Sequence, residues 1–255
     1  MPARNGRGAA PRYLAVGMAD VPAHDDWLSD IEADRLAGFT YTKRRDEARL
    51  GRWTAKQTLA GALRLEADSE VLRDLQIHNA PDGAPEVYMK SRPAPISISM
   101  TDRADWAVCT VIGGDRPIGC DLELVEPRSA AFVADYFTRR ERDVVAATPQ
   151  DHDLLANLIW SAKESALKVL RTGLRRDTRS VEVSLARGST ANGWSGLYVT
   201  TVEGLTFTGW WRRFGDFVLT YVSAISTAPP TSLVDPTPLE RATPSHAWSA
   251  QPRRQ

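Results

Sequence analysis

Three carboxylates and one lysine stand at spacings that could bind a divalent cation and a phosphate group. Asp121 and Glu123 are two residues apart in a strand-like segment, so on a strand both side chains would point to the same face. Glu164 and Lys168 are four residues apart in a segment with helical periodicity, and Trp160 lies one turn before Glu164. Two carboxylates this close repel each other unless a cation lies between them.

Each pattern alone also has an ordinary structural explanation. Asp121 and Glu123 could lie on a solvated strand face, and an exposed Glu–Lys pair contributes only about 0.3–0.5 kcal/mol to a helix. Trp160 argues against a wholly solvated helix face, because an indole there indicates packing.

A positive stripe on the first long helix likewise allows two interpretations, phosphate binding or a solvated face beside Asp46 and Glu47. Its members are Arg45, Arg49, Arg52 and Lys56. Together with the carboxylates and Lys168, this stripe supplies the groups that bind a polyphosphate through Mg²⁺. That ion shares its oxygen ligands among carboxylates, water and substrate phosphates.

The composition argues against several other classes. The chain has 255 residues, with 32 Lys and Arg against 32 Asp and Glu, so no net charge draws it to nucleic acid or a membrane surface. Four histidines are scattered without ligand spacing, which leaves zinc chemistry unsupported. Cys109 and Cys120 each lie in an apolar run, which favours buried free thiols. Since there is no secretory signal and no apolar stretch of roughly 20 residues, we expect a soluble, cytoplasmic protein.

The periodicities predict two successive units that position these residues. Helices are expected over 25–39, 43–65 and 151–171, with another beginning after Phe137, where Thr138 and Glu141 form a capping box. Strands are expected over 71–78, 86–90, 95–100, 106–112, 117–124, 181–185, 196–202, 206–211 and 217–225.

A turn signal at 113–115 divides the chain into an N-terminal half, 12–115, and a C-terminal half, 116–225. Residues 1–11 and the Pro-, Ser- and Thr-rich segment 226–255 are expected to be disordered. The prediction is an α/β (α+β) fold of two similar-sized halves, each a small, mainly antiparallel sheet with packed helices. A ligand cleft would lie between the halves. No repeat is visible in the residues themselves.

The two motifs together resemble those of one family, the Sfp-type 4′-phosphopantetheinyl transferases. The family's G-x-D-x-E strand is matched by G-C-D-L-E at 119–123, and its W-S-x-K-E-x-x-x-K helix by W-S-A-K-E-S-A-L-K at 160–168. Weaker similarities cover the F-[ST]-x-x-E segment at 137–141, the basic helix at 43–56, the D-G-A-P loop at 82–85 and the strand at 96–99. The resemblance implies the fold of that family, with two pseudo-symmetric halves.

The resemblance also implies an activity, the transfer of phosphopantetheine from coenzyme A to a serine of an apo acyl or peptidyl carrier protein, releasing 3′,5′-ADP. Asp121, Glu123 and Glu164 would hold Mg²⁺, and Glu164 would also be the general base. Lys168 would assist catalysis by contacting the phosphates. The residues expected to contact coenzyme A are Arg44, Arg52, Ser99, Thr101, Arg103, Lys163 and Lys168. We expect a monomer, because one chain contains both halves.

Two positions depart from the family pattern. Met100 replaces the histidine of the family's S-H-S element and cannot donate a hydrogen bond, and Ala84 replaces the lysine of its G-K-P loop. Arg103 could supply the lost positive charge. These departures leave open an alternative, a homologue that binds coenzyme A or a carrier without efficient turnover. A Mg²⁺-dependent nucleotide hydrolase is a further alternative, although no P-loop motif occurs. The zero net charge makes a DNA-binding module a poor fit.

Overall fold

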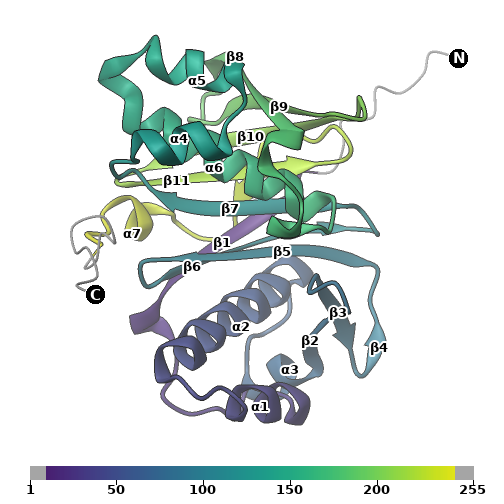
Figure 1. The fold of residues 1–255 in the computed structure, drawn as a ribbon. Coiled ribbons are helices and arrows are strands. Elements are labelled where there is room, and N and C mark those ends of the chain that lie inside the picture. The colour runs from purple at the N-terminus through teal and green to yellow at the C-terminus, as the bar shows by residue number, and fades with distance from the viewer. Residues whose placement is uncertain (1–9, 245–255) are drawn as a thin grey trace, which may run out of the picture.

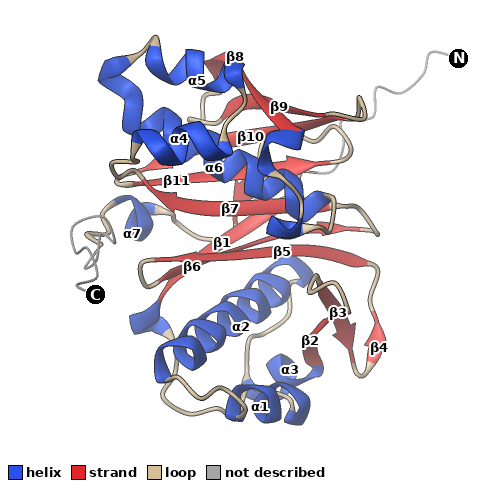
Figure 2. Cartoon of the chain, viewed as in Figure 1, coloured by secondary structure: helices blue, strands red, loops and turns tan. Residues whose placement is uncertain are grey.

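The computed structural model describes residues 10–244 and shows two stacked halves, each with its own sheet and helices (Figure 1). In the N-terminal half the long helix α2 packs on the sheet, and in the C-terminal half α6 does so (Figure 2). The expected mixed fold of two halves with small antiparallel sheets is confirmed. The helices are α1 (Asp30–Ala37), α2 (Thr42–Leu63), α3 (Ser69–Asp74), α4 (Ala130–Tyr136), α5 (Arg139–Ala146), α6 (His152–Val169) and α7 (Thr237–Glu240).

Three sheets carry the strands, in the orders β12-β1-β6-β5, β2-β3-β4 and β7-β11-β10-β9-β8. Apart from β1–β12, every ladder between these strands is antiparallel. The first-half strands are β1 (Arg12–Gly17), β2 (Leu75–Asn79), β3 (Pro85–Met89), β4 (Arg92–Pro93), β5 (Ile96–Arg103) and β6 (Trp106–Gly113). The others are β7 (Ile118–Leu124), β8 (Val181–Ser189), β9 (Ser195–Thr201), β10 (Thr206–Phe214), β11 (Phe217–Ser223) and β12 (Thr231–Ser232).

The halves meet where the edge strand β5 lies along the edge strand β7. Instead of a backbone ladder, two side chains of β5 accept hydrogen bonds from the backbone of β7. Ser99 Oγ accepts from the Cys120 N–H at 2.9 Å, and Thr101 Oγ1 accepts from the Leu122 N–H at 3.1 Å. These buried hydroxyls therefore satisfy edge N–H groups that would otherwise be left unpaired away from water.

A buried ion pair between Lys163 and Glu141 connects three elements of the C-terminal half. Lys163 Nζ lies 2.8 Å from Glu141 Oε2 and donates to the carbonyls of Thr178 and Val181, at 2.9 and 2.5 Å. Glu141 completes the capping box of α5 and accepts from the Val183 N–H at 2.7 Å. The pair therefore joins α6, α5 and β8.

The N-terminal half repeats this arrangement. Lys56 Nζ lies 2.6 Å from Glu32 Oε2 and donates to the carbonyls of Trp27 and Leu72. Glu32 completes the capping box of α1 and accepts from the Ile77 N–H. The sequence W-T-A-K at 53–56 thus corresponds to W-S-A-K at 160–163. The structure corrects the expectation that the residues contain no repeat. The two four-residue segments lie 107 positions apart, share three identical residues, and are recognised as equivalent only once the helices are paired.

Some elements differ from the expectation. The segment 71–78 is divided between α3 and β2, and α4 was not predicted because its seven residues are too few to show a clear period. Residues 226–244 do not form a disordered tail: β12 pairs with β1, and Leu239 of α7 is fully buried. The remaining parts of the expected disordered ends, 1–9 and 245–255, lie outside the described residues.

Two simpler expectations concern the thiols and the membrane. Cys109 and Cys120 are free and buried, as predicted. Within residues 10–244, the helices are too short or too polar to cross a lipid bilayer.

Candidate active site

The close approach of α6 to β7 positions the predicted site. Gly119 begins the motif on β7, and a Cβ built on it would lie 1.9 Å from the carbonyl oxygen of Ser165. Only glycine therefore allows the helix to lie this close to the strand. Ser161 strengthens the contact, because its Oγ donates to the Asp121 carbonyl at 2.9 Å.

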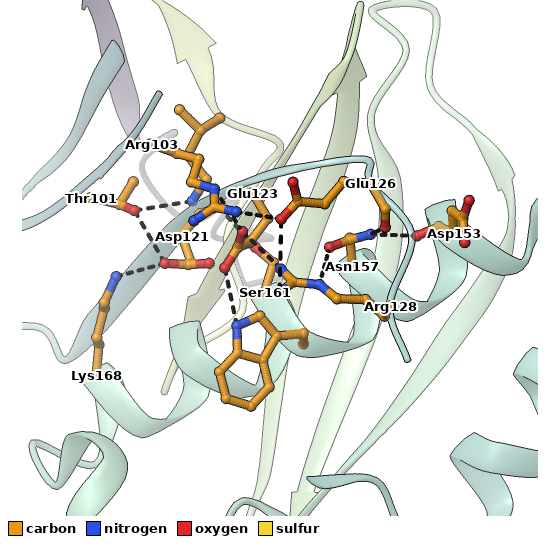
Figure 3. Close-up of polar contacts among 12 residues, drawn as sticks. Thr101, Arg103, Asp121, Glu123, Glu126, Arg128, Asp153, Asn157, Ser161 and Lys168 are labelled. Atoms are coloured by element: carbon orange, nitrogen blue, oxygen red, sulfur yellow. Dashed lines mark hydrogen bonds and ion pairs between the residues drawn. The ribbon is translucent and has the colours of Figure 1, made fainter. Parts of the chain in front are cut away.

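Asp121 is buried and has one satisfied and one unsatisfied oxygen. Its Oδ1 accepts from Lys168 Nζ at 3.0 Å and from Thr101 Oγ1 at 3.1 Å (Figure 3). Its Oδ2 is buried without a hydrogen-bond partner. A buried carboxylate oxygen without a donor is costly for the protein alone, and it is a suitable ligand for a cation.

Glu123 lies in a cluster of donors on the other side of Asp121. Its Oε1 accepts from Trp160 Nε1 at 3.0 Å, and its Oε2 lies 3.1 Å from Arg128 Nη2 and 3.3 Å from Arg103 Nε. Burial, followed by the charge of Asp121, raises the pKa of Glu123 to about 7 despite these arginines.

Glu164 and Lys168 project from successive turns of α6. Burial, and then the charge of Asp121, raises the pKa of the Glu164 carboxyl to about 8. Burial alone would lower the pKa of Lys168, but the neighbouring anions, Asp121 first, outweigh it and raise that pKa. In the metal-free protein, Glu164 thus keeps its proton at neutral pH, and Lys168 is a firmly protonated cation.

Donor chemistry and spacing decide how well the site fits Mg²⁺. Among residues 10–244, no three His, Cys, Asp or Glu side chains are already gathered as a metal-binding group. Both oxygens of Glu123 face protein donors, so this side chain has no oxygen ready for a cation. Asp121 and Glu164 fit the ion better. Asp121 has an unpartnered buried oxygen, and a cation would offset the burial and the Asp121 charge that raise the pKa of Glu164.

A cavity of about 880 Å³ lies between the halves beside these residues. Lys168, Ser99 and Met100 line it, so Lys168 joins the cavity to Asp121. The loop at 82–85, with Ala84, forms another part of the wall. Its positive charges, besides Lys168, are Arg116, Arg171 and Arg175.

The structure places several predicted coenzyme A contacts away from this cavity. Lys163 is fully buried in its pair with Glu141, so its ammonium does not face the cavity. Arg52 is also buried, where it donates to Asn79 Oδ1 at 2.7 Å. Arg44 is exposed in the first turns of α2, and it does not line the cavity.

Two further expectations for coenzyme A contacts are changed by the contacts observed. Arg103 was a candidate to supply the positive charge of the missing histidine, and in the structure its guanidinium is paired with Glu126 and lies beside Glu123. Thr101 does not line the cavity. Its hydroxyl donates to Asp121 and accepts from the backbone N–H of Leu122, where β5 meets β7.

The residues that complete the cluster of donors around Glu123 were not predicted from the sequence. Glu126 pairs with Arg103, and Arg128 donates through Nε to Asn157 Oδ1 at 2.6 Å. Asn157 in turn donates to the Glu126 carbonyl at 2.7 Å. The only signal for them was two further charges just beyond the end of the motif strand, at 126 and 128.

Comparison with known proteins bears on the C-terminal half. Residues 117–222 match the family model of the 4′-phosphopantetheinyl transferase superfamily, and this segment contains Asp121, Glu123, Glu164 and Lys168. A comparison with curated protein sequences gave no match.

Similar solved structures include two enzymes. One is a holo-(acyl-carrier-protein) synthase from Bacillus anthracis in complex with CoA (3′,5′-ADP), 18% identical, covering 42% of this chain and 96% of that one at a TM-score of 0.36. The other is a holo-[acyl-carrier-protein] synthase from Thermotoga maritima, 17% identical, covering 51% of this chain and 74% of that one at a TM-score of 0.31.

Proposed function

We propose that this protein is a Mg²⁺-dependent 4′-phosphopantetheinyl transferase of the Sfp type, acting on apo acyl or peptidyl carrier proteins. One observation carries the proposal: Asp121, Glu164 and Lys168 act on one another electrostatically where α6 crosses β7, inside the segment that matches the superfamily. The adjoining cavity of about 880 Å³ is within the range of cofactor sites, roughly 300–1,000 Å³.

The residues divide the chemistry among themselves. Mg²⁺ held by Asp121 and Glu164 would neutralise charge on the pyrophosphate of coenzyme A and on the leaving 3′,5′-ADP. Lys168 lines the cavity and would contact the same phosphates. The carrier serine oxygen forms a bond to the phosphorus next to pantetheine, and the bond from that phosphorus to 3′,5′-ADP breaks. With a cation bound, the Glu164 carboxyl would ionise, and it would then take the serine proton directly or through water.

The proposal extends to partners and setting. Because one chain contributes both walls of the cavity, we expect a monomer. We also propose that the protein works in the cytoplasm. Carrier domains of fatty-acid, polyketide or nonribosomal-peptide synthesis are the proposed partners.

Mass spectrometry of carrier proteins tests the proposal. The purified protein is incubated with coenzyme A, Mg²⁺ and a panel of apo carriers, and each carrier is weighed. We expect a gain of one phosphopantetheine, abolished by EDTA and by Asp121→Ala. No gain on any carrier, with coenzyme A still bound, would favour the non-catalytic homologue. Met100 and Ala84, both in the cavity wall, would then be the first positions to restore.

A further inference from the structure

Glu123 differs from Asp121 in having a protein donor beside each of its carboxylate oxygens. Its Oε1 accepts from Trp160 and its Oε2 faces two guanidinium groups, those of Arg128 and Arg103. Asp121, by contrast, keeps Oδ2 unpartnered. A cation entering the site therefore finds an available oxygen on Asp121. Glu123 would have to break its contacts with Arg103 and Arg128 before it could bind the cation.

The donors of Glu123 are themselves held in place. Arg103 pairs with Glu126, and Arg128 is fixed by Asn157. Glu123 and Glu126 balance the two arginines, so the cluster is neutral without a metal ion. Arg103 Nε and Glu126 Oε2 are buried without hydrogen-bond partners, but the opposite charges still hold the cluster together. It therefore has little reason to open when a cation binds next to it.

Trp160, the other hydrogen-bond partner of Glu123, lies on the same helix as Glu164, the proposed base. Trp160 stands one turn before Glu164 on α6, and its ring packs edge-on against Phe132 and Tyr136 of α4. The hydrogen bond from its indole to Glu123 therefore ties α6 to β7 at the turn that carries Glu164.

We propose that Glu123 is a positioning residue, which acts through Trp160 on the placement of Glu164, and that the metal ion is held by Asp121 and Glu164 alone. This inference rests on the proposed function. Glu123→Gln should then leave metal affinity nearly unchanged and lower turnover. Its amide oxygen would stay with the two arginines, so its NH₂ group would face Trp160 with a donor in place of an acceptor.

Direct metal binding separates the two roles. Mn²⁺ binding to the full-length protein is measured by electron paramagnetic resonance of the free ion. Asp121→Asn and Glu164→Gln should each weaken binding at least about tenfold, as loss of a ligand would, while Glu123→Gln should change it less than about threefold. An equal loss in Glu123→Gln would overturn the inference.

A double-mutant cycle tests the route through Trp160. Trp160→Phe keeps an aromatic ring against Phe132 and Tyr136 and removes the indole donor. It should lower kcat about tenfold, as Glu123→Gln does, with the KM for coenzyme A within about twofold. The double variant should be no slower than either single variant, because both remove the same hydrogen bond. Additive losses in kcat would contradict the proposal, and so would a Trp160→Phe variant with normal kcat.

Glu203→Gln is the control, because it removes an exposed carboxylate that pairs with Arg176 and does not belong to the cluster around Glu123. Its kcat should stay within about twofold of wild type at a temperature where circular dichroism shows full folding. If Glu123→Gln fails to fold, Trp160→Phe still decides the question through its kcat and Mn²⁺ affinity. If wild type transfers phosphopantetheine with Mn²⁺ while Glu123→Gln loses Mn²⁺ binding, this inference alone would be overturned. No Mn²⁺ binding by wild type would overturn both the inference and the proposed metal chemistry.

Discussion

Lys163 Nζ lies 2.8 Å from the carboxylate of Glu141 with both side chains excluded from water, although the residue next to Lys163 faces the proposed site. Burial lowers the pKa of Lys163, and Glu141 partly restores it. The ammonium is therefore used inside the protein, as part of the frame that holds α6.

Lys163→Met should destabilise the protein strongly. The substitution leaves the Glu141 carboxylate buried without its partner, which costs about 3–5 kcal/mol. The KM for coenzyme A should not change in the folded fraction, because the ammonium faces away from the cavity. Urea unfolding followed by circular dichroism measures the first effect, and steady-state kinetics the second.

Lys56→Met is the matched control for this prediction. It breaks the equivalent pair in the N-terminal half and should cost a similar free energy. A Lys163→Met protein with wild-type stability but a raised KM for coenzyme A would restore the sequence-based role as a phosphate contact.

The sequence located the motif residues and most elements, because periodicity and spacing are local properties. It could not assign Lys163, because the same lysine could point to a phosphate or to Glu141, and that choice depends on how α5 packs on α6. The arginine cluster around Glu123 was missed for a similar reason. Arg103 and Arg128 come from two segments that meet only when β5 lies along β7.

Gly119→Ala should separate α6 from β7. The new methyl group would lie 1.9 Å from the Ser165 carbonyl, which belongs to the helix backbone and cannot turn away. We expect a loss of at least about 3 kcal/mol in unfolding free energy, at the upper end of overpacking effects, and little remaining transfer activity.

A helical glycine with open space provides the contrast. A Cβ at Gly51 meets nothing within 4 Å, so Gly51→Ala should stabilise α2 by about 0.5–1 kcal/mol. Thermal unfolding of the two variants side by side checks both signs. A Gly119→Ala protein as stable as wild type would mean that the helix and strand can move apart at little cost.

The metal-free protein should lose stability as the pH rises from about 4.5 to about 8. Burial and Asp121 raise the pKa of Glu164 from 4.5 to about 8, so within this window the folded state keeps a proton that the unfolded state has released. Unfolding free energy therefore falls with increasing pH. Glu123, with its pKa raised to about 7, adds to the same trend.

Urea midpoints measured between pH 5 and 8.5 in EDTA check this dependence. Glu164→Gln should flatten the curve, whereas Glu70→Gln, at an exposed position of α3, should leave its shape unchanged. Parallel curves for wild type and Glu164→Gln would show that Glu164 does not titrate in this window.

The two family departures in the cavity wall should be reversible. Met100 and Ala84 both line the cavity, where neither can donate a hydrogen bond from its side chain to a phosphate. Met100→His combined with Ala84→Lys should lower the KM for coenzyme A several-fold, since a charge-assisted hydrogen bond contributes about 1.5–3 kcal/mol before its costs.

Arg103→Ala is the informative comparison, because Arg103 pairs with Glu126 and does not line the cavity. It should lower stability and kcat while the KM for coenzyme A stays within about twofold. A large rise in that KM would instead show that Arg103 swings into the cavity and replaces the missing histidine.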